Sequence, residues 1–211
     1  MKEDSLPIEI KDNYEKALMA MEKKNYDYAI ELLTHIINIK PDFVKGRKLL
    51  RLAEIKNFEK NPPNIIMRIM RRIFSFPHRF IAIINETKGD NHAAISIYEK
   101  ILRKDPNNVA VLIKLGNLLK IEGLKEASVI ILESAIKISE KNPTAYELLG
   151  KIYSDLGNYN QATFCFKKVL ELKPHDANAE RELKNIAALT TIDKSFDKKD
   201  NKDFRMREIE E

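Results

Sequence analysis

The sequence is short of cysteine, glycine and histidine, and each shortage excludes a class of site. The single cysteine, Cys165, excludes an intramolecular disulfide framework and favours a reducing compartment. Five of the six glycines recur at regular intervals, so only Gly46 remains and no glycine-rich phosphate loop can be assembled. The four histidines show neither an HExxH motif nor Cys/His ligand spacing. We therefore expect no metal, no cofactor and no enzymatic activity.

Long apolar runs are also missing. No stretch approaches the roughly 18 apolar residues of a membrane-spanning helix. The N-terminal sequence MKEDSLPIEI lacks the apolar core of a secretory signal. These absences predict a soluble cytoplasmic protein, and a hydrophobic content of 44% is enough for a continuous core.

A regularly spaced pattern of aromatic, small and apolar residues begins at Tyr146. Its members are Tyr146, Leu149, Gly150, Tyr153, Ala162, Phe166 and Pro174. One period of about 34 residues upstream, Leu115, Gly116, Gly123 and Leu132 occupy equivalent positions. Weaker copies come earlier, at Gly89, Ala94, Tyr98 and Pro106, and at Ala17, Ala29, Leu33 and Pro41. The chain therefore contains an internal repeat.

The spacing within each repeat is that of packed helix pairs. Small residues such as Gly116 and Ser128 allow antiparallel helices to approach closely, and larger apolar residues follow the i, i+3, i+4, i+7 spacing of a buried stripe. Gly89, Gly123 and Gly157 fall between paired helices, where a residue at positive φ ends the first helix. No window shows the sustained alternation of a strand.

The pattern at Tyr146 resembles the signature of the tetratricopeptide repeat family. The resemblance implies an all-α fold, a right-handed superhelical array of antiparallel helix pairs closed by a C-terminal capping helix. It also implies a protein that binds another polypeptide rather than one that catalyses a reaction.

The repeat divides the chain into consecutive segments. We expect an N-terminal extension (1–9), a first repeat unit (10–43), a degenerate basic helical unit (44–74), three repeat units (75–108, 109–142 and 143–176), a capping helix (177–192) and a disordered charged tail (193–211). An alternative for the tail is a short helix at 204–209 that docks on a partner or on the array.

The degenerate unit interrupts the period and carries the charge imbalance. Pro106 and Pro174 are 68 residues apart, twice the period, whereas Pro41 and Pro106 are only 65 apart. Residues 40–80 contain eleven Lys or Arg against three Asp or Glu. The positive net charge of the chain is therefore concentrated in this part of the sequence.

A basic amphipathic helix is expected at 65–76, set apart by Pro62 and Pro63 before it and Pro77 after it. On a helical wheel its basic surface, Arg68, Arg71 and Arg72, lies opposite Ile and Phe residues. Two interpretations remain open. The apolar side is buried between repeat helices, or the segment 61–80 attaches the protein to an anionic membrane or an acidic partner.

The family resemblance also implies a binding groove, because the first helices of successive units usually line the concave surface. Its residues would be Arg79, Ile83, Glu86, Ile113, Asn117, Lys120, Glu147, Lys151, Ser154, Arg181 and Asn185. The cationic and amide side chains could pair with acidic groups and hydrogen-bond a peptide backbone. The alternative is that these polar residues have no specific role.

The carboxylate clamp of chaperone-binding family members is not reproduced. Asn117 retains one of its five positions, but Ile113, Leu148, Asn178 and Glu182 stand at the other four. The leading hypothesis is therefore a non-catalytic scaffold that binds a different peptide or helix. Attachment to a membrane or assembly through 61–80 is the second, nucleic acid is not an expected partner, and the sequence does not give the oligomeric state.

Overall fold

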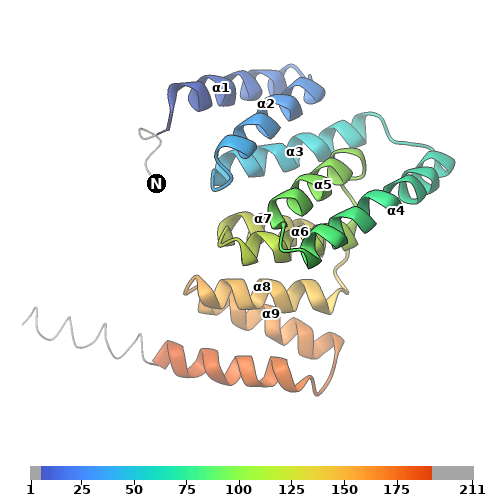
Figure 1. Cartoon of the computed structure of the whole chain (residues 1–211). Helices are drawn as coiled ribbons and strands as arrows, with labels where there is room; N and C mark the ends of the chain where they lie inside the picture. The colour runs from blue at the N-terminus through green and yellow to red at the C-terminus, as the bar shows by residue number, and fades with distance from the viewer. Residues whose placement is uncertain (1–5, 192–211) are drawn as a thin grey trace, which may run out of the picture. The chain divides into compact units, whose positions relative to one another are not determined.

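Helices account for most of the chain in the computed structural model, which describes residues 6–191 apart from the side chains of residues 65, 68, 69 and 71–75. The helices are α1 (Ile8–Glu22), α2 (Tyr26–Ile39), α3 (Val44–Lys60), α4 (Ile65–Thr87), α5 (Asn91–Lys104), α6 (Val109–Ile121), α7 (Lys125–Ile138), α8 (Pro143–Asp155) and α9 (Tyr159–Leu172) (Figure 1). Residues 177–191 are also helical, and residues 6–191 contain no strand. The predicted all-α, tetratricopeptide-like solenoid fold is confirmed. The predicted tail at 193–211, with its alternative helix at 204–209, lies outside the described residues.

The chain divides into two compact units between Glu140 and Lys141. In the second unit, α8 packs against α9. The two helices approach closely at Gly150, where a Cβ atom would lie 2.9 Å from the Phe166 ring. Gly157, at φ 74°, makes the turn between them. The same signature residues that identified the repeat therefore form its helix contact and its turn.

In the first unit, α1 packs on α2, α4 on α5 and α6 on α7. Each pair is joined by a short turn with a residue at positive φ, which is Lys24 in the first pair and a glycine in the other two. Leu115, Leu119 and Leu132 are fully buried in the α6–α7 pair. These contacts are the helical-hairpin packing that the repeat spacing predicts.

Helix α3 departs from this pattern. It packs on α2 and also contacts α5 and α7, the second helices of the following two pairs. In a regular array the helix after α2 would instead pair with its successor. The interval from Pro41 to Pro106 is three residues shorter than two repeat periods, and this interval contains α3, the helix that contacts α5 and α7.

Helix α4 begins at Asn64, whose side chain accepts a hydrogen bond from the Met67 N–H at 2.8 Å. The helix continues through Pro77 to Thr87. The expectation that Pro77 would end a discrete basic helix is therefore wrong. A proline inside a helix removes one hydrogen bond and costs about 3 kcal/mol, and packing of the C-terminal half of α4 on α5 offsets this cost.

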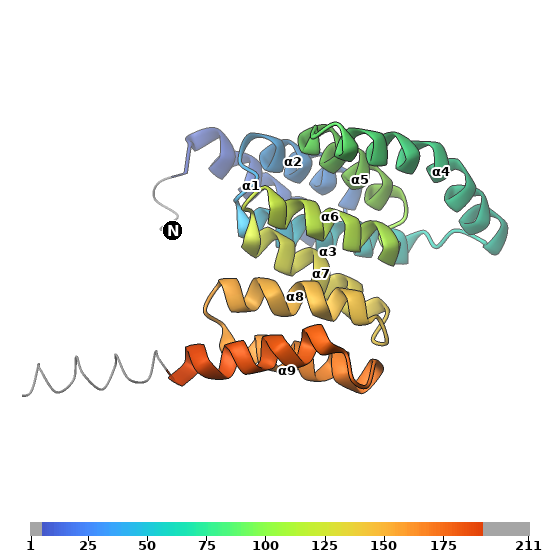
Figure 2. The same ribbon diagram turned by 60° about the horizontal axis from the view of Figure 1, so that its bottom comes forward.

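Both views show the N-terminal half of α4 extending beyond the other helices of its unit (Figures 1 and 2). Across residues 6–191, no helix has the length and apolar content required to cross a bilayer.

Candidate functional site

Two helices of the first unit carry six of the predicted groove residues. Arg79, Ile83 and Glu86 lie on α4, and Ile113, Asn117 and Lys120 lie on α6. The Lys114 Nζ atom lies 3.4 Å from the Glu86 Oε2 atom, so these two helices meet at that pair. We call the six residues the α4–α6 face. Five of them are partly buried and Ile83 is exposed.

Glu86 is already engaged by neighbouring side chains. It accepts a hydrogen bond from the Tyr98 hydroxyl on α5 and pairs with Lys114 on α6. Burial, followed by the hydrogen bond to Glu86, raises the pKa of Tyr98 above its usual range. Glu86 therefore ties together α4, α5 and α6, and holds the α4–α6 face in place.

The second unit carries the remaining predicted groove residues. Glu147, Lys151 and Ser154 are partly buried on α8, and Arg181 and Asn185 are exposed on the helix at 177–191. Lys151 Nζ lies 2.6 Å from Glu147 Oε1 four residues earlier. This pair leaves Lys151 35% exposed, so its charge is still accessible to a partner.

An exposed apolar surface runs along α4. Ile66, Met70, Phe76, Phe80 and Ile83 are 68%, 42%, 70%, 60% and 40% exposed. On a helix that advances about 100° per residue, they fall within an arc of about 140°, and two further exposed apolar residues of α4, Met67 and Ile81 at 47% and 50%, lie beside that arc. We call the five residues within the arc the α4 stripe. The interpretation in which the apolar side of 65–76 is buried between repeat helices is wrong for the side chains that the structure describes.

The physical reason is the position of α4. Its extensive contacts are with α5, and Ala82, on the side of α4 opposite the stripe, is fully buried. The neighbouring α3 packs on α2, α5 and α7 instead. Within the first unit, no described helix is therefore placed to cover the stripe.

The predicted basic surface lies on the same helix. The backbone of Arg68, Arg71 and Arg72 belongs to α4, but their side chains are outside the described part of the chain, so this surface remains a prediction. The sequence from 61 to 85 contains these three arginines and Arg79 and no aspartate or glutamate.

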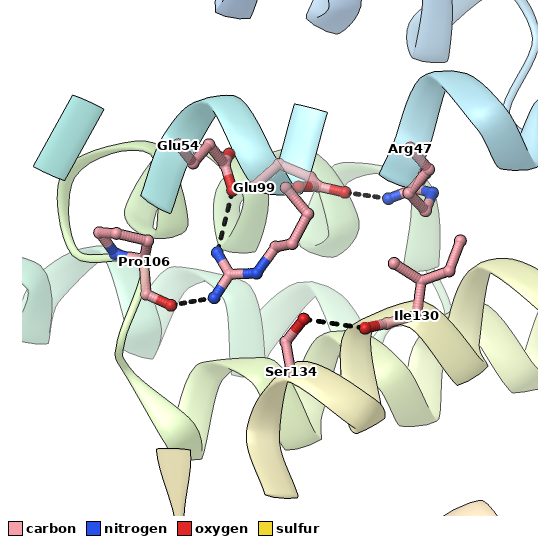
Figure 3. A network of polar contacts seen from close by, with 7 residues as sticks. Arg47, Glu54, Glu99, Pro106, Ile130 and Ser134 are labelled. Carbon is pink, nitrogen blue, oxygen red and sulfur yellow. Dashed lines mark hydrogen bonds and ion pairs between the residues drawn. The ribbon is translucent and has the colours of Figure 1, made fainter. Parts of the chain in front are cut away.

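A buried polar network on α3 is a feature that the sequence interpretation missed. Arg47 pairs with Glu99 on α5, and Arg51 pairs with Glu54 at 3.0 Å and donates to the Pro106 carbonyl oxygen (Figure 3). Both arginines and Glu54 are less than 5% exposed. Two of the eleven basic residues at 40–80 are thus paired with acidic residues inside the first unit.

Sequence spacing offered a signal for this network. Arg47, Arg51 and Glu54 are separated by four and three residues, the spacing of a core-facing stripe on a helix. Opposite charges on a buried stripe have to pair internally, but Lys56 and Glu59 have the same spacing on the same helix and are exposed, so spacing alone is a weak signal. Burial raises the pKa of Glu54 to about 7, and the Arg51 guanidinium opposes this increase.

Two cavities flank α3. One of about 140 Å³ lies among α2, α3 and α5 and is lined in part by Glu54, Glu99 and Arg103. The other, about 400 Å³, lies between α3 and α7 and is lined in part by Leu52 and Ile138. Among the described residues, no group of three metal-ligating side chains occurs.

Comparison with known families identifies the repeat. The family model described as Tetratricopeptide repeat matches residues 109–142 and 143–176. No curated protein matches the chain.

Several solved structures share the fold. The first TPR domain of Spaghetti (RPAP3), bound to the HSP90 peptide SRMEEVD, is 20% identical with a TM-score of 0.53, and the match covers 56% of this chain and 93% of that domain. The Arabidopsis OM64 TPR domain is 17% identical with a TM-score of 0.52 and coverages of 55% and 96%. The Sgt2 TPR domain from Aspergillus fumigatus is 21% identical with a TM-score of 0.51 and coverages of 56% and 79%. At these identities the likeness is one of fold.

Proposed function

We propose that the chain, whose residues 109–176 match the tetratricopeptide repeat model, is a non-catalytic, cytoplasmic adaptor that binds a peptide or helix of another protein. Fold alone does not assign a function, so the proposal depends on a particular surface. That surface is the α4–α6 face, where Ile83 and Ile113 lie with Asn117 and Lys120 on helices joined by the Glu86–Lys114 pair. A preorganised surface loses little conformational entropy when a partner binds.

The side chains of the α4–α6 face indicate the chemistry of the partner. Arg79 and Lys120 would pair with carboxylates, and the Asn117 amide can both donate to and accept from a peptide backbone. Ile83 and Ile113 would contact an apolar side chain. We therefore propose an acidic segment with at least one apolar residue.

This peptide would differ from a chaperone C-terminus. The Spaghetti domain is bound to an HSP90 peptide, but Ile113 and Leu148 stand here where chaperone-binding members carry Lys and Asn. An isoleucine and a leucine cannot hydrogen-bond a terminal carboxylate. An internal acidic segment, held through Asn117 and Lys120, fits these residues better.

Site-specific photocrosslinking in cells tests the proposal. A photoreactive residue at Asn117 should crosslink a discrete partner, and Lys120→Glu should weaken the crosslink by reversing the charge beside it. The matched control is the same probe at Glu126, an exposed residue of α7. Equal crosslinking from both positions, or no effect of Lys120→Glu, would count against the α4–α6 face.

A second candidate function is attachment to an anionic membrane surface through 61–80. The specific observation in its favour is the exposure of Ile66, Met70 and Phe76 on a helix that carries four arginines and no acidic residue before Glu86. Helices with an apolar side and cationic residues bind membrane interfaces. An apolar surface that stays uncovered in a folded protein also indicates an interaction site.

Flotation with lipid vesicles tests this second function. The full chain should float with vesicles that contain phosphatidylserine and remain behind with phosphatidylcholine alone. Replacing Arg68, Arg71 and Arg72 with glutamate should abolish flotation because the charge changes sign. Unchanged flotation of that variant would remove the basic surface from the proposal. A triple variant of three exposed lysines of the second unit, Lys167→Glu with Lys173→Glu and Lys184→Glu, controls for the general loss of positive charge.

A further inference from the structure

The α4 stripe continues along the helix beyond the arginines at 68, 71 and 72. It begins at Ile66 and continues through Phe76 to Phe80, in the half of α4 that packs on α5, and ends at Ile83, which is shared with the α4–α6 face. We infer that this stripe is a membrane-insertion surface, which lies flat in the interface of an anionic bilayer with Phe76 and Phe80 among the lipids. The inference rests on the second proposed function and assigns the insertion to residues that extend beyond 61–80.

The shape of the first unit allows a planar surface to reach the stripe. In both views the N-terminal half of α4 lies outside the other helices of the unit (Figures 1 and 2). Phe76 and Phe80, four residues apart, are 70% and 60% exposed. Residues spaced in this way lie on one side of a helix, so both rings can enter a bilayer at once.

The stripe is held outward by the packing of the rest of α4. Ala82 is fully buried on the side that faces away from the stripe. Glu86 accepts a hydrogen bond from Tyr98 and pairs with Lys114. These contacts hold the C-terminal half of α4 against α5 and α6, and rotation of the helix to bury the stripe would break them.

Charge selects an anionic bilayer over the other possible occupants. Residues 61–85 carry four arginines and no acidic residue. Each cation close to an anionic surface adds to binding, whereas apolar side chains alone would not distinguish anionic from neutral lipid. A second copy of the chain would cover the apolar residues but would leave the four arginines without an anionic partner.

A single tryptophan at the stripe tests insertion directly, because the chain contains no tryptophan. In Phe80→Trp, vesicles that contain phosphatidylserine should shift the emission to shorter wavelength, and brominated lipids should quench it. Phosphatidylcholine alone should do neither. The matched control is Phe164→Trp, which replaces a 55% exposed phenylalanine on α9 and should show no response to either vesicle.

Removal of the rings gives an independent measurement. Phe76→Ser with Phe80→Ser should reduce partitioning into anionic vesicles by about tenfold or more, since each ring loses its burial in the bilayer. Both side chains are exposed, so the helical circular dichroism spectrum should not change. Partitioning that equals that of the unaltered chain would overturn the inference.

The outcomes separate this inference from the second proposed function. If the unaltered chain does not float with anionic vesicles, both fail. If it floats but the Phe80→Trp emission stays that of a solvent-exposed indole, attachment through the arginines stands and insertion of the stripe is overturned. A shift that appears without vesicles and grows with protein concentration would show that the occupant is a second copy, which also overturns the inference.

Discussion

Replacing Arg51 with methionine measures how much the buried network on α3 contributes to stability. Arg51 and Glu54 are three residues apart, their charged atoms are 3.0 Å apart, and both side chains are 4% exposed. Lys56 and Glu59 repeat the same spacing on the same helix at 2.9 Å, but are 47% and 57% exposed. The two pairs differ mainly in burial, so Lys56→Met is the matched control.

The magnitude follows from that difference in burial. At an effective dielectric constant of about 20, two charges 3 Å apart attract by roughly 5 kcal/mol. Part of this is offset by desolvation, and removing one partner of a buried pair typically costs about 3–5 kcal/mol. Arg51→Met also takes away the donor to the Pro106 carbonyl oxygen. We expect a loss of about 3–5 kcal/mol at pH 8 and little change for Lys56→Met, because exposed pairs contribute little.

Urea denaturation of the full chain measures both values, and pH provides a second test. Since the pKa of Glu54 is about 7, its carboxyl group is largely neutral at pH 5 and leaves no unpaired charge when Arg51 is replaced. The cost of Arg51→Met should therefore be smaller at pH 5 than at pH 8. Equal costs for the two variants, or an Arg51→Met cost that does not vary with pH, would refute the reasoning.

Three further predictions concern stability, pH and peptide choice. In Gly116→Ala the new Cβ would lie 2.6 Å from the Leu132 side chain, so thermal or urea unfolding should show a loss of about 1–3 kcal/mol from overpacking. Glu54 binds its proton more tightly in the folded state, so its contribution should lower stability by up to roughly 3 kcal/mol as pH rises from 4.5 to about 7; Glu54→Gln should flatten that part of the pH profile, and an unchanged slope would contradict the assignment. A labelled SRMEEVD peptide should show no saturable anisotropy change with this chain, whereas the Spaghetti domain serves as the positive control; saturable binding here would contradict the proposal that Ile113 and Leu148 prevent carboxylate recognition.

The sequence was most informative where local spacing determines packing. The residues from Tyr146 to Phe166 predicted the helix pair α8–α9, because a small residue at Gly150 and a ring at Phe166 have to meet in that arrangement. Gly157 adopts the positive φ that its place in the repeat requires. The family resemblance is confirmed for residues 109–142 and 143–176, which match the family model.

The sequence was least informative where long-range contacts override local signals. Pro77 normally ends a helix, yet α4 continues because its next turns pack on α5. Arg47 and Arg51 add to the excess of positive charge counted at residues 40–80. In the structure they are buried because their partners, Glu99 and the Pro106 carbonyl oxygen, come from a distant part of the chain. The sequence left two interpretations of the apolar side of α4 open for the same reason, since the pattern of an apolar helix side does not reveal whether a neighbour covers it.

The crossover of α3 changes how the first unit is expected to open. In a regular repeat array each repeat contacts only its neighbours, so structure can be lost progressively from one end. Here Arg47 of α3 pairs with Glu99, 52 positions later in the sequence, and Arg51 donates to Pro106, 55 positions later. Helix α3 also contacts α7, which follows the pair α4–α5 in the chain. Opening α6–α7 alone would therefore uncover the side of α3 where Arg51 lies next to α7. The slowest-exchanging amide hydrogens of α2, α3, α5 and α7 should consequently exchange together, as one cooperative block rather than as independent repeats.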